Sequence, residues 1–77
     1  MLAMLASRKP ESSICPSEVA RDMWPKDQWR DHMDDVRAVA ASLARTGRVK
    51  ITQGKVEVDL VDVKGPIRIR RGPQWQA

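Results

Sequence analysis

Residues 47–71 most constrain the fold, because apolar and polar residues alternate along them with the two-residue period of a β-strand. A turn around Gly54 divides the first alternating stretch, and Gly65-Pro66 precedes the second. The residues expected to face the core are Val49, Ile51, Val56, Val58, Leu60, Ile67 and Ile69. The residues expected to face outward are Lys50, Thr52, Glu57, Asp59, Arg68 and Arg70. We predict a β-hairpin whose first and last strands pair, with the residues between them forming a wing.

A long amphipathic helix is predicted directly before this hairpin. Its apolar residues recur at spacings of four, three, four and three, which keeps them on one helix face. These residues are Trp29, Met33, Val36, Ala40 and Leu43. We expect Asp27 to cap the start of this helix and Gly47 to follow its end, because each residue type suits that position.

Two shorter helices are predicted upstream. Apolar residues at positions 2, 5 and 6 have helical spacing and stop before Pro10, so we expect a short first helix. Ile14 can add a short strand, and Pro16 suits the first position of a second helix, which we place at residues 16–23. The expected core residues of this second helix are Val19, Ala20 and Met23.

Three helices followed by a β-hairpin wing make an α+β fold of the winged-helix type. A chain of 77 residues supports one small hydrophobic core, so we predict a single domain over residues 1–77. The tail, residues 72–77, is a candidate for flexibility, and the favoured role of Trp75 is to fold back onto the domain. Trp24 and Trp29 bracket the turn before the long helix and are expected to cap the core.

Charge is distributed unevenly along the chain. Residues 1–44 carry six Lys/Arg and seven Asp/Glu, a net charge of −1, whereas residues 45–77 carry eight and three, a net charge of +5. The basic C-terminal part suits a phosphate-bearing or acidic partner. An ordinary solvated basic surface explains the charge equally well.

Seven basic residues are candidates for nucleic-acid binding: Arg37, Arg45, Lys50, Lys55, Lys64, Arg68 and Arg70. In a winged helix the third helix approaches the major groove, where arginines hold phosphate or read guanine. Alternate strand residues project to one side, so Arg68 and Arg70 are placed to grip successive phosphates. The alternatives are local pairing of the helix arginines with Asp34 and protection of an exposed sheet edge by charge.

Acidic residues weigh against base reading by the long helix. Asp27, Asp31, Asp34 and Asp35 crowd its N-terminal half, which recognition helices usually present to base edges. Their charge repels phosphate, so we expect the wing and the last strand to contribute more to DNA contact than the helix tip.

Other kinds of site have little support. A single cysteine, Cys15, allows neither an internal disulfide nor a multi-cysteine zinc site, and favours a reducing, cytoplasmic location. The lone His32 has no evident orienting acid, and the serines lack a nucleophile-elbow motif. No segment has the roughly 20 apolar residues of a membrane span. We therefore expect no enzyme activity, no metal, no cofactor and no membrane insertion.

Several blocks of the sequence resemble a family of small bacterial proteins of unknown function that is similar in fold to winged helix-turn-helix proteins. The resemblance rests on Ser13-Ile14-Cys15-Pro16-Ser17-Glu18-Val19-Ala20-Arg21, Trp29-Arg30, Met33, Val36-Arg37, Ala40, Leu43, Gly47, Ile51-Thr52-Gln53 and Lys64-Gly65-Pro66-Ile67-Arg68. It spans roughly residues 12–70, with CPSEVAR and KGPIR as its most specific blocks. It implies a winged-helix fold and no established activity.

Two functions remain open from the sequence. The favoured one is a nucleic-acid-binding module, resembling a transcription regulator, that contacts the phosphates of double-stranded DNA through its basic wing. The alternative is a protein–protein interaction module that binds no nucleic acid.

Overall fold

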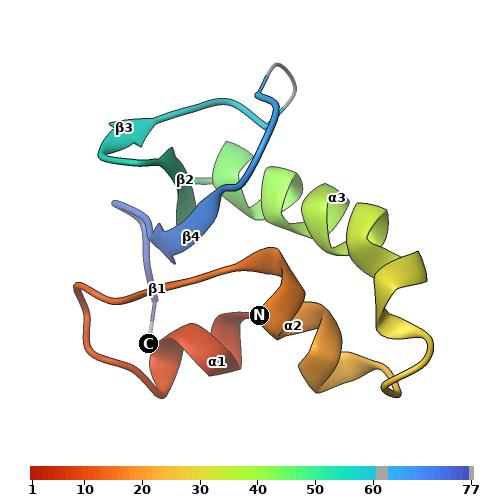
Figure 1. Ribbon diagram of the computed structural model, residues 1–77. Helices are drawn as coiled ribbons and strands as arrows, with labels where there is room; N and C mark the ends of the chain where they lie inside the picture. Colours follow the sequence, from red (N-terminus) through yellow and green to blue (C-terminus); the bar gives the residue numbers. More distant parts are fainter. Residues whose placement is uncertain (61–62, 77) are drawn as a thin grey trace.

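The sheet consists of four antiparallel strands in the order β1-β4-β2-β3 (Figure 1). The structure is a computed structural model that describes residues 1–60 and 63–76. The strands are β1 (Ser13–Ile14), β2 (Val49–Gln53), β3 (Val56–Glu57) and β4 (Arg68–Arg71). The last strand lies between the first two, so the two ends of the sequence meet inside one sheet.

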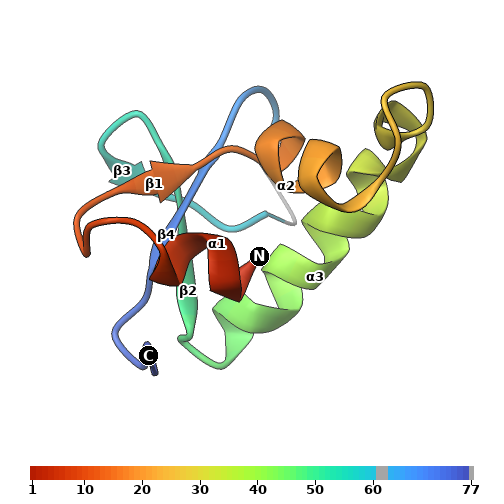
Figure 2. The same ribbon diagram turned by 90° about the horizontal axis from the view of Figure 1, so that it is seen from below.

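The helices pack on one side of this sheet. They are α1 (Leu2–Ala6), α2 (Pro16–Met23), the short 3₁₀ helix η1 (Trp29–His32) and α3 (Met33–Arg45). Helices α2 and α3 pack against each other, and α3 also packs against β2 (Figure 2). The chain is therefore a small α+β domain with three α-helices and a four-stranded antiparallel sheet. Among the described residues no helix is long and apolar enough to cross a membrane.

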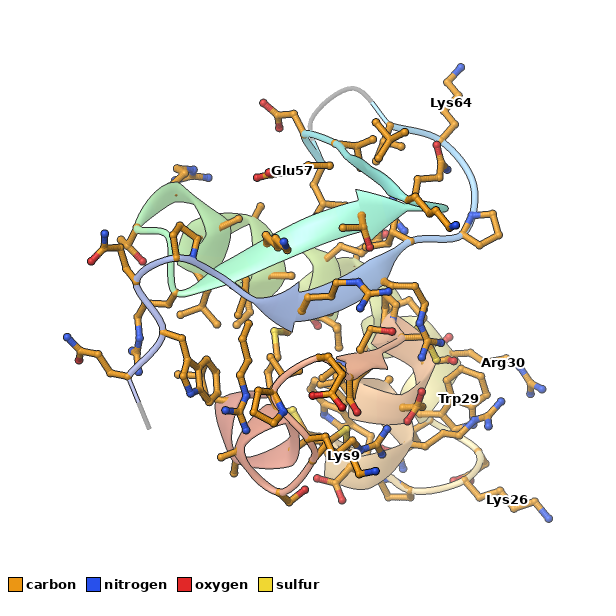
Figure 3. All side chains as sticks on the ribbon, turned by 90° about the vertical axis from the view of Figure 1, so that its left-hand side faces the viewer. Lys9, Lys26, Trp29, Arg30, Glu57 and Lys64 are labelled. Carbon is orange, nitrogen blue, oxygen red and sulfur yellow. The ribbon has the colours of Figure 1, made fainter. Side chains whose placement is uncertain are left out.

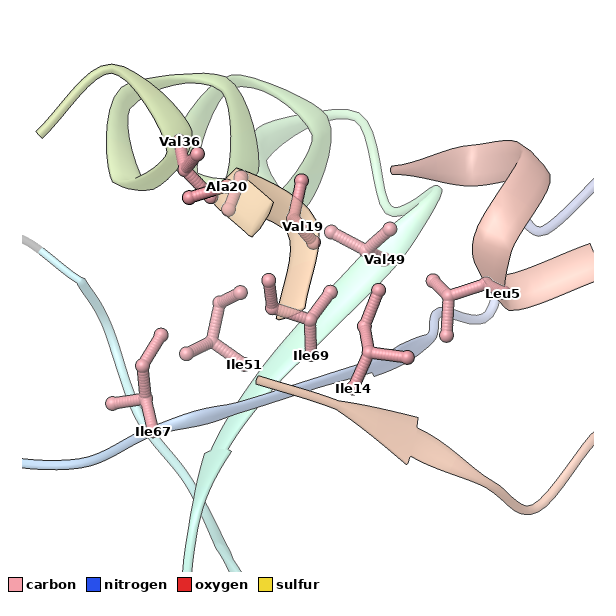
Figure 4. Close-up of a cluster of buried hydrophobic side chains, with 10 residues drawn as sticks. Leu5, Ile14, Val19, Ala20, Val36, Val49, Ile51, Ile67 and Ile69 are labelled. Atoms are coloured by element: carbon pink, nitrogen blue, oxygen red, sulfur yellow. The ribbon is translucent and has the colours of Figure 1, made fainter. Parts of the chain in front are cut away.

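The core lies between the sheet and the helices α2 and α3 (Figure 4). Its centre is a row of isoleucines in register, because Ile69 of β4 pairs with Ile14 on one side and with Ile51 on the other. The buried apolar residues are Leu5, Ile14, Val19, Ala20, Val36, Ala40, Val49, Ile51, Ile67 and Ile69. The isoleucine row thus gives three strands one continuous apolar surface, against which the helices pack.

Several expectations are confirmed. The second helix has the predicted bounds, the short first helix and the strand at Ile14 are present, and the first and last hairpin strands pair from Val49↔Arg71 to Thr52↔Arg68. Gly47 follows α3 with φ of 77°, and its N–H bonds to the Ala44 carbonyl at 3.0 Å. The Arg48 N–H bonds to the Leu43 carbonyl at 3.1 Å, which completes a Schellman motif.

The start of the long helix differs from the prediction. Asp27 is not its cap, because α3 begins at Met33 after η1, and His32 precedes its first turn. The 3₁₀ turn is tighter than an α-helical turn. In it the His32 ring stacks on Trp24, with ring centroids 4.0 Å apart and planes within 4°. Aromatic packing at this corner therefore takes the place of a longer α-helix.

The burial of three residues differs from the prediction. Val56 is 64% exposed and Met23 is 58% exposed, although both are predicted to lie in the core, and Thr52 is buried although it is predicted to face outward. Strand β3 has only two residues, so Val56 lies at a sheet edge that the helices do not cover. Thr52 is covered by arginines of β4: Arg68 lies opposite it in the sheet, and the Arg70 Nε donates to its Oγ1 at 3.4 Å.

The tail after β4 lies against the corner between α3 and β2. The Gly72 N–H donates to the Arg48 carbonyl at 3.0 Å, and the Gln74 N–H donates to the Gly47 carbonyl at 2.8 Å. Trp75 packs on the core and on the guanidinium of Arg71, 4.8 Å from the ring centre. Residues 72–75 thus contact the packed domain, and Trp75 folds back onto it as predicted.

Candidate anion-binding surface

Arg68 and Arg70, two of the predicted phosphate ligands, extend from β4 toward the segment that precedes α2. The Arg68 Nε donates to the Ser13 Oγ at 2.9 Å and its Nη2 to the Ser13 carbonyl at 3.0 Å. The Arg70 Nη1 donates to the Glu11 carbonyl at 2.8 Å. The two side chains do project together, as their spacing predicts. Several of their N–H donors nevertheless bond to Glu11 and Ser13, and so hold β1 and the residue two positions before it against β4.

Arg71 fastens the other end of the same strand. Its Nη2 donates to the carbonyls of Leu5 at 3.1 Å, Ala6 at 3.5 Å and Arg8 at 2.9 Å, which close the C-terminal end of α1. A cation at this end also offsets the negative pole of the helix dipole. This arginine is a structural residue that the sequence analysis did not identify.

The other five candidates are spread over three elements and two loops. Arg37 and Arg45 lie on α3, Lys50 on β2, Lys55 in the β2–β3 turn and Lys64 in the loop before β4. Arg45, Lys55 and Lys64 are exposed, while Arg37 and Lys50 are half-buried. None of the five forms an ion pair with a carboxylate among the described residues.

Arg45 stands beside a hollow between α3 and the segment that follows β3. This hollow has a volume of about 440 Å³. It is lined by Ala41, Ala44, Arg45, Ile51, Glu57, Val58, Asp59 and Leu60. Glu57 and Asp59 bring two carboxylates to its lining, which disfavour an anionic ligand inside the hollow.

The outer face of α3 carries little positive charge. Its exposed residues are Asp34, Asp35, Ala38, Val39, Ser42 and Arg45. The Asp35 Oδ2 lies 2.9 Å from the His32 Nδ1, so one of the acids is held at the start of the helix. This face therefore presents two carboxylates and one guanidinium group to solvent.

A second group of cations gathers at the corner between α2 and η1. Arg21 comes from the last turn of α2, Lys26 from the turn that follows, and Trp29 and Arg30 from η1. Together they line a hollow of about 420 Å³, which we call the corner pocket. The guanidinium carbons of Arg21 and Arg30 lie 4.7 Å and 4.8 Å from the centre of the Trp29 ring. Figure 3 shows Lys26, Trp29 and Arg30 together at one end of the molecule.

The corner pocket was missed in the sequence because Trp29 was assigned to the core. Trp29 does pack against the core, yet one part of its ring is left for the two guanidinium groups. The available signal was a Trp-Arg pair beside a lysine in a proline-containing turn. Such a pattern becomes informative only when the turn geometry brings Arg21 to the same ring.

Glu18 forms a partly exposed ion pair with Arg8. Its Oε2 lies 2.9 Å from the Arg8 Nη1, and its Oε1 accepts from the Cys15 N–H at 3.2 Å. Partial burial raises the pKa of Glu18, but hydrogen bonds from Cys15 and the Arg8 guanidinium outweigh it, so the net pKa is lowered. This carboxylate caps α2 in its charged form. Within the described part of the chain no cluster of His, Cys, Asp and Glu could hold a metal ion.

Comparison with known proteins places the chain in a family. A search of curated proteins gives no match. The family model described as "Protein of unknown function (DUF3253)" matches residues 1–72, which is nearly the whole chain. The resemblance to a family of unknown function is thereby confirmed at this level. The chain belongs to the DUF3253 family.

Proposed function

We propose that the protein is a winged-helix module that binds nucleic acid by holding the phosphate backbone rather than by reading bases. The observation that carries the proposal is a set of cations on α3 and the hairpin that form no ion pair with any described carboxylate: Arg37, Arg45, Lys50, Lys55 and Lys64. Charges left without an internal partner neutralise phosphates and release counterions on binding.

The order of elements supports the fold part of this proposal. A short strand after the first helix, two further helices and a hairpin that returns beside the short strand are typical of winged helices. In that class the helix in the position of α3 lies near the groove and the hairpin contacts the backbone. Fold analogy alone does not carry function, so the free cations remain the main argument.

Within this proposal the exposed wing lysines contribute more than the arginines of β4. Lys55 and Lys64 are exposed. Arg68 and Arg70 spend several of their five N–H donors on Ser13, Thr52 and Glu11. The remaining donors can still reach a phosphate that lies along the strand. We expect Arg68 and Arg70 to assist at a site that the lysines dominate.

Fluorescence anisotropy with a random-sequence duplex at several salt concentrations tests the proposal. If about five phosphates are neutralised, the logarithm of the affinity falls with the logarithm of salt concentration at a slope of roughly −4 to −5. The Lys55→Gln/Lys64→Gln variant should weaken binding and make the slope shallower by about 2. Absence of binding at low salt would overturn the proposal.

The outer face of α3 favours a second candidate, head-to-tail self-association. Val39 is 51% exposed there and lies about one helical turn after the exposed Asp35. An acidic, partly apolar face and a basic hairpin on one molecule are complementary surfaces for successive copies. Sedimentation at high protein concentration tests this candidate. A monomer at both low and high salt would rule it out.

A further inference from the structure

Beyond backbone contact by the hairpin, we propose that the corner pocket binds a small organic phosphate through Arg21, Lys26 and Arg30. Nothing in this proposal depends on the hairpin cations, so the two binding functions can be tested separately. The ligand class is a phosphomonoester, such as a nucleoside monophosphate.

Contact with Trp29 holds the two arginines at the pocket. Their guanidinium carbons lie 4.7 Å and 4.8 Å from the ring centre, a distance at which a cation is attracted to the face of an indole ring. The ring thus restrains Arg21 and Arg30 before any ligand arrives. Because little side-chain freedom remains to be lost, binding costs less entropy than it would at two mobile arginines.

The donors of the corner pocket have no acceptor within the described part of the chain. Arg21, Lys26 and Arg30 form neither an ion pair nor a side-chain hydrogen bond with any described residue. The arginines of β4 differ, since each of them donates to a carbonyl. An oriented guanidinium pair without an internal acceptor is suited to bidentate recognition of a phosphate.

Size and charge favour a compact ligand over a long polyanion. The volume of about 420 Å³ lies within the roughly 300–1,000 Å³ that is usual for small-molecule sites. Asp22, Asp27 and Asp31 are neighbours in sequence and balance the three cations, so the local net charge is zero and long-range attraction is weak. A ligand must therefore come within hydrogen-bond distance of the guanidinium and ammonium N–H groups to bind. A phosphomonoester, with a charge of about −1.5 to −2 at neutral pH, can accept these hydrogen bonds through three oxygens.

The pocket wall accounts for the organic part of the ligand. Trp29 is half-buried and supplies apolar surface next to the three cations. Amphipathic aromatic rings commonly sit where an apolar body and a polar group meet. We therefore expect a nucleoside monophosphate to bind more tightly than inorganic phosphate, which lacks a group to contact the ring.

Isothermal titration calorimetry with adenosine monophosphate, inorganic phosphate and adenosine tests the site. Adenosine monophosphate should bind most tightly, inorganic phosphate more weakly, and adenosine not at all. Lys26→Gln should weaken binding of the monophosphate about tenfold or more, because it removes a charge-assisted hydrogen bond. Lys9→Gln is the matched control: it removes the same charge from an exposed lysine that lies apart from Lys26 in Figure 3.

Two outcomes would overturn the proposal. One is the absence of binding by both phosphates at millimolar concentration, and the other is an equal loss in the Lys26→Gln and Lys9→Gln variants. Neither outcome bears on duplex binding through the hairpin, which Lys55→Gln/Lys64→Gln tests.

Competition experiments identify the source of the phosphate. In these experiments a 5′-phosphorylated oligonucleotide competes with adenosine monophosphate for the pocket. If the oligonucleotide binds more tightly than adenosine monophosphate, the natural ligand is the phosphorylated end of a nucleic acid. Equal or weaker displacement would point to a free metabolite. Displacement by the same oligonucleotide without a terminal phosphate would contradict the assignment to a phosphomonoester.

Discussion

Strand β4 and the corner pocket use the same kind of side chain in opposite ways. The three arginines of β4 donate to backbone carbonyls of residues 5–13 and so join the start of the chain to its last strand. The arginines of the corner pocket stack on one tryptophan and donate to no described residue. An arginine that donates to backbone carbonyls of a distant segment thus has a structural role. An arginine that lies over an aromatic ring keeps the N–H groups of its guanidinium for another acceptor.

The largest expected effect concerns the core side of β4. Ile69 is fully buried at the centre of the isoleucine row, so Ile69→Ala removes apolar contacts and leaves a cavity in the core. We expect the free energy of unfolding to fall by about 3–4 kcal/mol. Urea denaturation followed by circular dichroism measures it. A loss below about 1 kcal/mol would contradict the central role of this strand.

Arg71→Ala should give the next largest effect. The change removes the donor to the carbonyls of Leu5 and Arg8 and the stacking partner of Trp75. We expect a loss of about 2 kcal/mol, typical of hydrogen bonds made by a charged group together with lost packing. Arg45→Ala is the matched control, since this exposed arginine has no described partner and should change stability by less than about 0.5 kcal/mol. Equal losses in the two variants would remove the distinction between structural and free arginines.

The pH dependence of stability tests the contact between Glu18 and Arg8. The pKa of Glu18 is lower in the folded protein than in the unfolded chain, so the unfolded chain binds the proton more readily. Its contribution to stability is present above the unfolded pKa, about 4.3, and is lost as the pH falls from there through the lower folded pKa. As the pH is lowered from 6 to 3, the unfolding temperature should therefore fall less steeply for Glu18→Gln than for the unchanged protein. Parallel curves would show that this carboxylate has no special role.

The smallest effect on stability is expected at the corner pocket. Lys26→Gln should change the free energy of unfolding by no more than about 0.5 kcal/mol, because its side chain has no hydrogen-bond partner among the described residues. Arg30→Gln should cost about 0.5–1 kcal/mol, because it also removes the contact between the guanidinium and the Trp29 ring. Retained stability would also show that any loss of phosphate binding in Lys26→Gln is not a loss of folding. A destabilisation as large as that of Arg71→Ala would mean that the pocket cations, too, are structural.

Periodic segments of this chain were predictable from sequence, and contacts between distant segments were not. The bounds of α2 and the inward direction of Ile67 and Ile69 follow from Pro16, the break at Trp24-Pro25 and strand alternation. The exposure of Val56 does not follow, because an alternating pattern contains no information on where the helices stop covering the sheet. The start of α3 depends on stacking between Trp24 and His32, eight residues apart across a turn.

The same limit applies to the candidate sites. The exposure of Lys55 and Lys64 could be predicted from the sequence, because a lysine in a turn is usually exposed. The internal partners of Arg68 and Arg70 could not, because Ser13 and Glu11 lie more than fifty residues away along the chain. The corner pocket needs the turn after α2 to bring Arg21 and Arg30 to one ring.

The place of β4 in the middle of the sheet also sets the order of events in folding. Ser13 and Arg68 are 55 residues apart in sequence, so β1 has no strand to pair with until β4 has reached the sheet. Closing so long a loop costs chain entropy before any pairing can repay it. We therefore expect the helical segment α2–α3 to associate early through contacts between neighbouring residues, and β1 and β4 to pair late. The hydrogen bonds from the arginines of β4 to residues 5–13 would then form in the same late step.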